Sequence, residues 1–204
     1  MLITWDKLQQ FNLNITGILH VGAHECQELQ SYENILPRSK ILWIEAMPDK
    51  VDSNKANYTN ILIEQAVVCE TDDEPITFNV ANNDQSSSIL EFGTHSTAYP
   101  YIVYTHTLQL TTSRLDTILN KIQYSHIQFN FLNIDIQGAE LKALIGLGAL
   151  LNNFSYLYIE VNTEEVYKNC TTLEELDIYL NGFGFTRVLT VINTEGWGDA
   201  FWIK

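Results

Sequence analysis

Asp135 is the residue whose type and position most directly predict chemistry. It lies near the end of an apolar run, residues 129–136, which is rich in β-forming side chains and stops at Gly138. After Gly138, apolar residues recur with the spacing of a helix face. Asp135 therefore ends a predicted buried strand, where open α/β sheets bind ligands, and its carboxylate could orient an acceptor or take its proton. The alternative is that Asp135 only caps the turn.

A second acid, Glu45, ends another predicted strand. The first predicted strand, residues 17–22, finishes at Gly22, and Glu45 follows that glycine at close to the ~20 residues at which an acid meets a ribose hydroxyl in dinucleotide-binding folds. His24 and Cys26 occupy the places where a phosphate-cradling turn has its other glycines. The sequence therefore predicts a ligand that has a ribose but no pyrophosphate.

S-adenosylmethionine is a ligand that has a ribose but no pyrophosphate. Its sulfonium cation suits a cleft lined by Glu45, Asp135 and Glu160. A nicotinamide-dependent oxidoreductase is the weaker alternative, because the glycine pattern is incomplete and no Tyr-x-x-x-Lys pair occurs.

Composition excludes several other classes of function. The 204 residues, 46% of them apolar, predict one domain with a sizeable core. With 11 basic and 25 acidic residues the net charge is −14, which disfavours binding to nucleic acids and to anionic membranes. Three widely spaced cysteines without a C-x-x-C pair predict free thiols rather than a disulfide framework or a zinc site. Residues 1–6 do not resemble a leader peptide, so we expect a cytoplasmic protein.

The elements that position these acids alternate between strand and helix. Predicted strands at residues 17–22, 40–45 and 61–68 are separated by helical stretches at residues 25–34 and 49–57. Short connections of this kind are typical of a parallel sheet with right-handed crossovers. The first third of the chain therefore predicts an α/β fold.

The middle of the chain is less regular. We expect a strand at residues 74–81, a substrate-facing loop at about residues 82–107, a short strand at residues 108–110 and a helix opened by Ser113 and Asp116. His95 and His106 could act as a general base towards a hydroxyl, although solvated loop histidines are the commoner case. The loop also contains aromatic residues that either wall a pocket or pack internally: Tyr99, Tyr101 and Tyr104.

The last third of the chain predicts a different connection. A strand at residues 154–161 precedes a helix with a capping box at Thr172 and Glu175. The strands predicted at residues 185–192 and 199–203 are joined by a connection too short for a crossover helix, so they form an antiparallel hairpin.

Taken together, these motifs resemble the FkbM family of S-adenosylmethionine-dependent methyltransferases over residues 17–202. The most specific piece is Asp135-Ile-Gln-Gly138-Ala-Glu140, which is similar to the family's Asp-x-x-Gly-x-Glu element. The others are Val21-Gly22-Ala23-His24, Ile44-Glu45-Ala46-Met47-Pro48, the serines at 86–88, Arg114-Leu115-Asp116, Ile159-Glu160-Val161-Asn162 and Trp197-Gly198-Asp199-Ala200. The resemblance implies a class I methyltransferase, Rossmann-like fold: a seven-stranded, mostly parallel sheet with a C-terminal antiparallel hairpin and helices on both faces.

The resemblance also implies roles for individual residues. Glu45 would hold the ribose hydroxyls of S-adenosylmethionine, and Asp135 would face the methyl-transfer centre. Two residues depart from the common pattern, because His20 stands where many methyltransferases have an acid and Cys26 where this family commonly has glycine. The remaining positions in the expected cofactor site are Gly22 and Ala23 against the methionine part, Gln65 and Ala66 flanking the adenine, and His20, His24 and Ala46 beside them.

The sequence thus predicts an enzyme that methylates a hydroxyl of a sugar or another small metabolite. Asp135 is the leading catalytic candidate, with His95 and His106 behind it. Glu140 is expected to support the turn near the helix start, although a catalytic role stays open, and a nucleophilic Cys26 lacks a partnered base. An inactive module that keeps the fold for binding is the alternative from another class. The acceptor, the oligomeric state and any metal assistance are left open.

Overall fold

The chain folds around a seven-stranded sheet. The computed structural model describes residues 2–204, so Met1, part of the segment in which no leader is expected, lies outside it. The strands of this sheet are β1 (Ile18–Val21), β2 (Ile41–Glu45), β3 (Leu62–Gln65), β7 (Phe131–Ile134), β8 (Tyr156–Asn162), β9 (Thr186–Ile192) and β10 (Trp197–Ile203). Their order is β3-β2-β1-β7-β8-β10-β9, and β10 runs antiparallel to both of its neighbours. The predicted mostly parallel sheet with a C-terminal hairpin is therefore confirmed.

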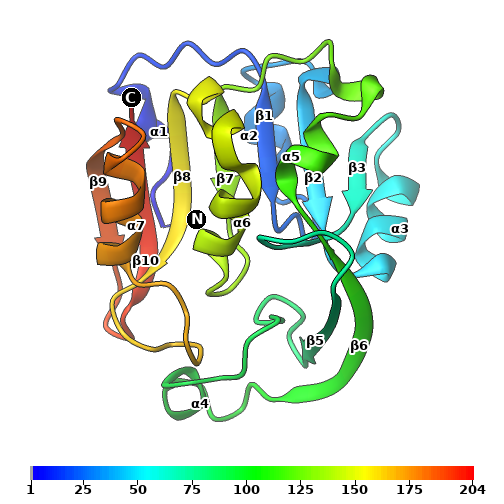
Figure 1. Cartoon of the computed structure of the whole chain (residues 1–204), viewed down its shortest axis with the longest axis vertical. Coiled ribbons are helices and arrows are strands. Elements are labelled where there is room, and N and C mark those ends of the chain that lie inside the picture. Colours follow the sequence, from blue (N-terminus) through cyan, green and yellow to red (C-terminus); the bar gives the residue numbers. More distant parts are fainter. Residues whose placement is uncertain (1) are drawn as a thin grey trace.

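Helices cover both faces of this sheet (Figure 1). Side chains alternate along β1, so Leu19 and Val21 join one apolar core while Ile18 joins the other. The first core is completed by α5 (Leu115–Leu119), α6 (Glu140–Leu147) and α7 (Leu173–Asn181), and the second by α1 (Trp5–Gln9), α2 (Leu29–Glu33) and α3 (Pro48–Asn57). Three short 3₁₀ helices lie at Arg38–Lys40, Ile122–Tyr124 and Gly148–Asn153.

A second, three-stranded sheet lies beyond the carboxyl ends of the parallel strands (Figure 1). It consists of β4 (Val67–Val68), β5 (Pro75–Ala81) and β6 (Tyr104–Ser113), with β5 and β6 antiparallel. The short helix α4 (His95–Ala98) lies in the connection between β5 and β6. The segment predicted as a substrate-facing loop is therefore part of an ordered layer below the main sheet.

Four predicted elements differ from the structure. The strand predicted at residues 61–68 is two strands in different sheets, because the chain leaves the main sheet at Ala66, whose amide donates to the Glu45 carbonyl at 2.9 Å. The strand predicted at 108–110 runs for ten residues, since its polar start pairs with β5. The helix predicted at 25–34 is only α2, after a left-handed Cys26 with φ 53°. Ser113 belongs to β6, and α5 begins at Leu115.

The predicted capping box is confirmed. Thr172 accepts a hydrogen bond from the Glu175 amide at 3.3 Å, and the Glu175 carboxylate accepts one from the Thr172 amide at 2.8 Å. This reciprocal cap fixes the start of α7, which packs on the sheet beside β9 and β10. Within residues 2–204, no helix has the length and apolar character needed to cross a membrane.

Candidate functional site

A cavity of about 530 Å³ opens at the carboxyl ends of the parallel strands. Its walls come from β1, β2, β7 and β8 on one side and from the connection between β5 and β6 on the other. A volume of this size accommodates a small-molecule ligand. Of the residues predicted to bind a cofactor or to act in catalysis, those that line it are His20, Gly22, His24, Glu45, Ala46, Ala66, His95 and Asp135.

Gly22 allows β1 and β7 to end close together. Its φ is 93°, and a Cβ atom built on it would lie 1.8 Å from the Asp135 carbonyl oxygen. The Gly22 and Ala23 amides donate to the Ile44 carbonyl at 2.9 and 3.0 Å. Glycine is therefore required here by the neighbouring strand, before any ligand is considered.

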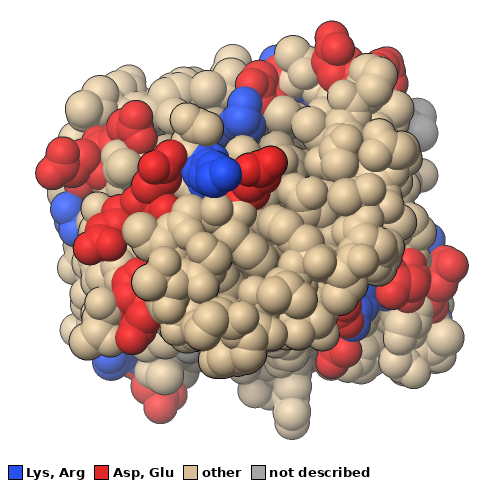
Figure 2. Space-filling view, turned by 90° about the horizontal axis from the view of Figure 1, so that it is seen from below, with Lys and Arg blue, Asp and Glu red and all other residues tan. Residues whose placement is uncertain are grey.

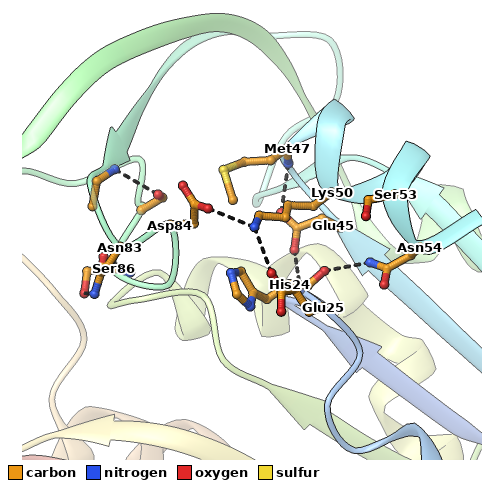
Figure 3. Close-up of polar contacts among 12 residues, drawn as sticks. His24, Glu25, Glu45, Met47, Lys50, Ser53, Asn54, Asn83, Asp84 and Ser86 are labelled. Carbon is orange, nitrogen blue, oxygen red and sulfur yellow. Dashed lines mark hydrogen bonds and ion pairs between the residues drawn. The ribbon is translucent and has the colours of Figure 1, made fainter. Parts of the chain in front are cut away.

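The Glu45 carboxylate is held by the backbone around it (Figure 3). It accepts hydrogen bonds from the His24 amide at 2.7 Å and from the Met47 amide at 2.8 Å. Asn54 of α3 donates to the His24 carbonyl at 2.6 Å, which fixes the left-handed turn at His24. Burial raises the pKa of Glu45, and its backbone hydrogen bonds oppose that shift. Glu45 is thus a rigid acceptor at the cavity wall.

Lys50 ties the lower layer to the main sheet (Figure 3). Its ammonium group forms ion pairs with Asp84, between β5 and α4, at 2.8 Å and with Glu25 at 3.2 Å. At the other end of the same connection, the Gly93 and His95 amides donate hydrogen bonds to the Val166 carbonyl at 2.9 and 3.2 Å. The wall facing the sheet is therefore anchored at both ends.

Asp135 and Glu160 are joined by a side-chain amide. The Gln137 Nε2 atom donates to Asp135 Oδ1 at 2.7 Å and to Glu160 Oε2 at 2.8 Å. The Gln137 Oε1 atom of the same side-chain amide accepts a hydrogen bond from the Tyr167 hydroxyl at 2.5 Å. Asp135 is exposed to the cavity, whereas Glu160 is only 7% exposed. Enclosure by protein raises the pKa of Asp135 and raises that of Glu160 well above its usual value.

Two further acids lie close to this pair. Glu140 is fully buried, and its carboxylate accepts from the Gly138 and Ile136 amides at 3.0 and 3.2 Å, which supports the turn before α6. Burial raises the pKa of Glu140 to about 7. Asp199 lies directly opposite Glu160 in the β8–β10 ladder and accepts a hydrogen bond from the Tyr158 hydroxyl. The expected supporting role of Glu140 agrees with these contacts.

His20 belongs to a buried hydrogen-bonded chain. Its Nδ1 atom lies 2.9 Å from the Tyr32 hydroxyl and its Nε2 atom 3.2 Å from the Gly22 carbonyl, so the neutral ring carries its proton on Nε2. Asn133 donates to the same Tyr32 hydroxyl at 2.9 Å. Burial lowers the pKa of His20 to about 4. Asn133 Oδ1 has no hydrogen-bond partner among residues 2–204 and is buried at the cavity.

The opposite wall is aromatic. The His95 ring stacks on Phe92 with centroids 4.3 Å apart, and the Trp197 indole donates to the Tyr99 hydroxyl at 3.1 Å. His95 is 5% exposed, and burial lowers its pKa, so the ring is neutral at neutral pH. Its Nδ1 atom and the Asn162 amide nitrogen are buried without a hydrogen-bond partner in the described chain. Both residues line the cavity, His95 from the connection between β5 and β6 and Asn162 from the end of β8, so unsatisfied polar atoms lie beside the aromatic rings.

The remaining predicted residues lie outside the cavity wall. Ala23 is buried behind Gly22, and the Gln65 side chain is used in a 2.9 Å bond to the Ala46 carbonyl. His106 is exposed on β6 with Nδ1 beside the Thr105 hydroxyl. Burial raises the pKa of Cys26, which opposes a nucleophilic thiolate there.

Several residues of the site were missed from the sequence. Asn133 could have been found, because it lies two residues before Asp135 in a strand and so shares its face. Gln137 and Asn162 stand in the motifs that resemble the FkbM family, but their contacts could not be predicted, since these depend on segments distant in the sequence. Among residues 2–204, no group of three or more His, Cys, Asp or Glu side chains could hold a metal ion.

Comparison with known proteins agrees with this architecture. A solved S-adenosylmethionine-dependent methyltransferase from Aquifex aeolicus aligns with a TM-score of 0.51 at 14% identity, over 98% of this chain and 88% of that one. TrmK from M. capricolum, solved with S-adenosyl-homocysteine, aligns with a TM-score of 0.52 at 10% identity, over 100% of this chain and 69% of that one. No curated protein matches. Residues 20–187 match the methyltransferase FkbM domain model, which spans most of the chain, and the chain therefore belongs to that family.

Proposed function

We propose that this protein is an S-adenosylmethionine-dependent methyltransferase that methylates a hydroxyl group of an uncharged, polyhydroxylated acceptor such as a sugar. The observation that carries the proposal is the convergence of Glu45, Asp135 and Asn133 on one cavity at the carboxyl ends of adjacent strands, where Asn133 Oδ1 has no hydrogen-bond partner among residues 2–204. Membership of the FkbM methyltransferase family supports the same reaction. When bound, the cofactor supplies an electrophilic methyl group on a sulfonium cation.

The residues of the sheet side fit this cofactor. Glu45 has a further lone pair on each carboxylate oxygen and can accept hydrogen bonds from two ribose hydroxyls. Asn133 Oδ1 is a buried acceptor that lacks a donor within the described residues, as a bound ammonium group would supply. Asp135 and Glu160 add negative charge to the cavity, which favours a cation over a phosphate group. These residues would bind and orient the donor.

The opposite wall fits the acceptor. Trp197 and Tyr99 offer flat apolar surfaces for a sugar ring, while His95 Nδ1 can accept a hydroxyl proton and Asn162 can donate to a hydroxyl oxygen. The molecular face below the sheet has a broad continuous area without acidic or basic side chains (Figure 2). An uncharged acceptor meets no electrostatic penalty there, whereas nucleic acids are disfavoured by the net charge of −14.

Asp135 is the group we place next to the reacting hydroxyl. It is exposed to the cavity, and Gln137 holds its carboxylate in one orientation. An aligned acceptor removes much of the entropic barrier of a displacement reaction, and the enclosing wall excludes water. His95 is the second candidate base, because its ring is neutral and its Nδ1 atom has no partner within residues 2–204. His106 receives no role, since it lies outside the cavity wall.

The proposal is tested by incubating the protein with S-adenosylmethionine and a panel of glycans and small polyols, followed by mass spectrometry. We expect one acceptor to gain the mass of a methyl group on oxygen, and Asp135→Asn to lower the rate by roughly 10²–10⁴-fold, the range typical of a lost general base. Glu174→Gln, an exposed change on α7, is the control and keeps full activity. Tight cofactor binding without transfer to any acceptor would contradict the enzymatic proposal and favour a binding module.

A further inference from the structure

Asp135 and Glu160 are two carboxyl groups in one small space. A single amide nitrogen, Gln137 Nε2, lies 2.7 Å from one carboxyl oxygen and 2.8 Å from the other. The two carboxyl groups are also within hydrogen-bonding reach of each other. Both groups line the cavity. Two carboxylates held this closely repel each other strongly, so one of them keeps a proton unless a cation is near.

No side chain of residues 2–204 pairs that charge with a cation. None of the ion pairs found within residues 2–204 includes Asp135 or Glu160. The nearest basic side chain, His20, is neutral because burial lowers its pKa to about 4. The titratable groups that face the pair are Asp199 on β10, Glu140 on α6, Tyr158 on β8, Tyr167 before α7 and His20 on β1. Their charges are zero or negative, so they oppose a second negative charge on the pair.

Asn133 provides an independent indication of a ligand at this place. Its Oδ1 atom is buried in the same cavity without a partner in the described chain, while its amide nitrogen is already engaged with Tyr32. A buried carbonyl oxygen left without a donor destabilises the free protein, and a donor on a ligand would satisfy it. A cationic ligand with N–H groups satisfies both this oxygen and the two acids.

We propose that Asp135 and Glu160 form a pair that carries one shared proton in the free protein and releases it when the cationic cofactor binds. The proposal rests on the proposed function, since it takes S-adenosylmethionine as the ligand. Before binding, the pair holds one negative charge and one proton. After binding, the sulfonium and ammonium charges stabilise the second carboxylate, and the proton passes to solvent. Burial and mutual repulsion raise the pKa of both groups, which agrees with a retained proton.

The same pair can close the reaction cycle. The two carboxylates accept the acceptor's hydroxyl proton as the oxygen–methyl bond forms and the sulfur–methyl bond breaks. The pair then again holds one proton and one negative charge, and the cofactor product is a neutral thioether. Because S-adenosylhomocysteine lacks the sulfonium charge, its binding should release fewer protons from the pair than the binding of S-adenosylmethionine does. Glu160 is thus a proton-sharing residue of the site, and Gln137 positions it against Asp135.

The direct test is isothermal titration calorimetry of the full chain near neutral pH, in buffers with different ionisation enthalpies. The buffer dependence of the heat counts the protons released. We expect S-adenosylmethionine to release about one proton and S-adenosylhomocysteine clearly fewer. At pH values where the free pair still holds its proton, the affinity for S-adenosylmethionine should increase about tenfold for each unit by which the pH is raised. The affinity for S-adenosylhomocysteine should change less over the same range.

Glu160→Gln separates this proposal from a general effect of pH. Glutamine resembles the protonated acid in shape and charge, so the variant should bind S-adenosylmethionine without the proton release and with a flatter pH dependence. Glu174→Gln should behave as the unchanged protein. Equal proton release for the two ligands, or release unchanged in Glu160→Gln, contradicts the shared proton. Failure of both ligands to bind the unchanged protein instead contradicts the proposed function.

Discussion

At the scale of single residues, the site combines rigid acceptors with unpaired polar atoms. Glu45 is fixed by two backbone amides, whereas Asn133 Oδ1, Asn162 Nδ2 and His95 Nδ1 have no partner in the part of the chain that the structure describes. Buried polar atoms are normally satisfied, so such a group of exceptions around one cavity indicates ligand contacts. Glu45, Asp135 and Glu160 could be predicted as site residues because each ends an apolar run that predicts a strand. The contacts of Asn162 could not be predicted.

Glu45→Gln is expected to weaken the binding of S-adenosylmethionine by roughly tenfold to a hundredfold, because hydrogen bonds to a charged acceptor contribute about 1.5–3 kcal/mol. Glutamine keeps one acceptor oxygen and places an NH₂ group against one of the two amides. Equilibrium binding measures the loss, and circular dichroism checks the fold. The control is Glu174→Gln, an exposed acid on α7. Equal affinities for both variants would show that Glu45 does not hold the cofactor.

His20 should make the protein sensitive to acid. In the unfolded chain its pKa is about 6.5, and burial lowers it to about 4 in the folded protein. Between these values the unfolded chain binds a proton that the folded protein does not, so stability falls as the pH decreases through this window, by about 3 kcal/mol in total. Asp135 and Glu160 act in the opposite direction, since their pKa values are raised.

Denaturant unfolding from pH 7 to pH 4 measures this contribution. His20→Gln removes the titrating ring and should lose less stability than the unchanged protein over the same window, by about 3 kcal/mol. His126→Gln, an exposed histidine elsewhere, should follow the unchanged protein. If His20→Gln lost as much free energy of unfolding between pH 7 and pH 4 as the unchanged protein, groups other than His20 would cause the loss.

At the scale of elements, the strand ends set the geometry of the site. β1 and β7 meet at Gly22 and Asp135, and the β8–β10 register places Glu160 opposite Asp199. Alternation and strand–helix spacing were sufficient to predict the main sheet and the hairpin. They failed for β6, because its first residues are polar and it is formed by pairing with β5 rather than by local preference. The second sheet and the anchored wall were therefore not predicted.

Gly22→Ala should disrupt the junction between β1 and β7. The added Cβ would collide with the Asp135 carbonyl, and a φ of 93° is unfavourable for alanine. We expect a loss of more than about 3 kcal/mol in the free energy of unfolding, or failure to fold. Gly182→Ala, at the end of α7 with φ −60°, is the matched control and should change stability by less than about 1 kcal/mol. Similar losses in both variants would contradict this role for Gly22.

At the scale of the whole molecule, the two sheets enclose the cavity between them. The main sheet contributes the carboxylates, Asn162 and Trp197, and the layer with β5, β6 and α4 contributes His95, Tyr99 and the outer face with few charges (Figures 1 and 2). In the proposed function, the donor lies against the strand ends and the acceptor between Trp197 and this layer. The donor side could be predicted from strand ends. The acceptor side could not, because its residues come from irregular segments whose positions depend on distant contacts.

The central claim is that this cavity binds S-adenosylmethionine, and a direct binding titration tests it most simply. The unchanged protein is titrated in parallel with S-adenosylmethionine, S-adenosylhomocysteine and a nicotinamide dinucleotide. We expect saturable binding of the first two ligands at one site per chain, weakened by Glu45→Gln, and no binding of the dinucleotide. Binding of the nicotinamide dinucleotide together with no binding of S-adenosylmethionine would contradict it.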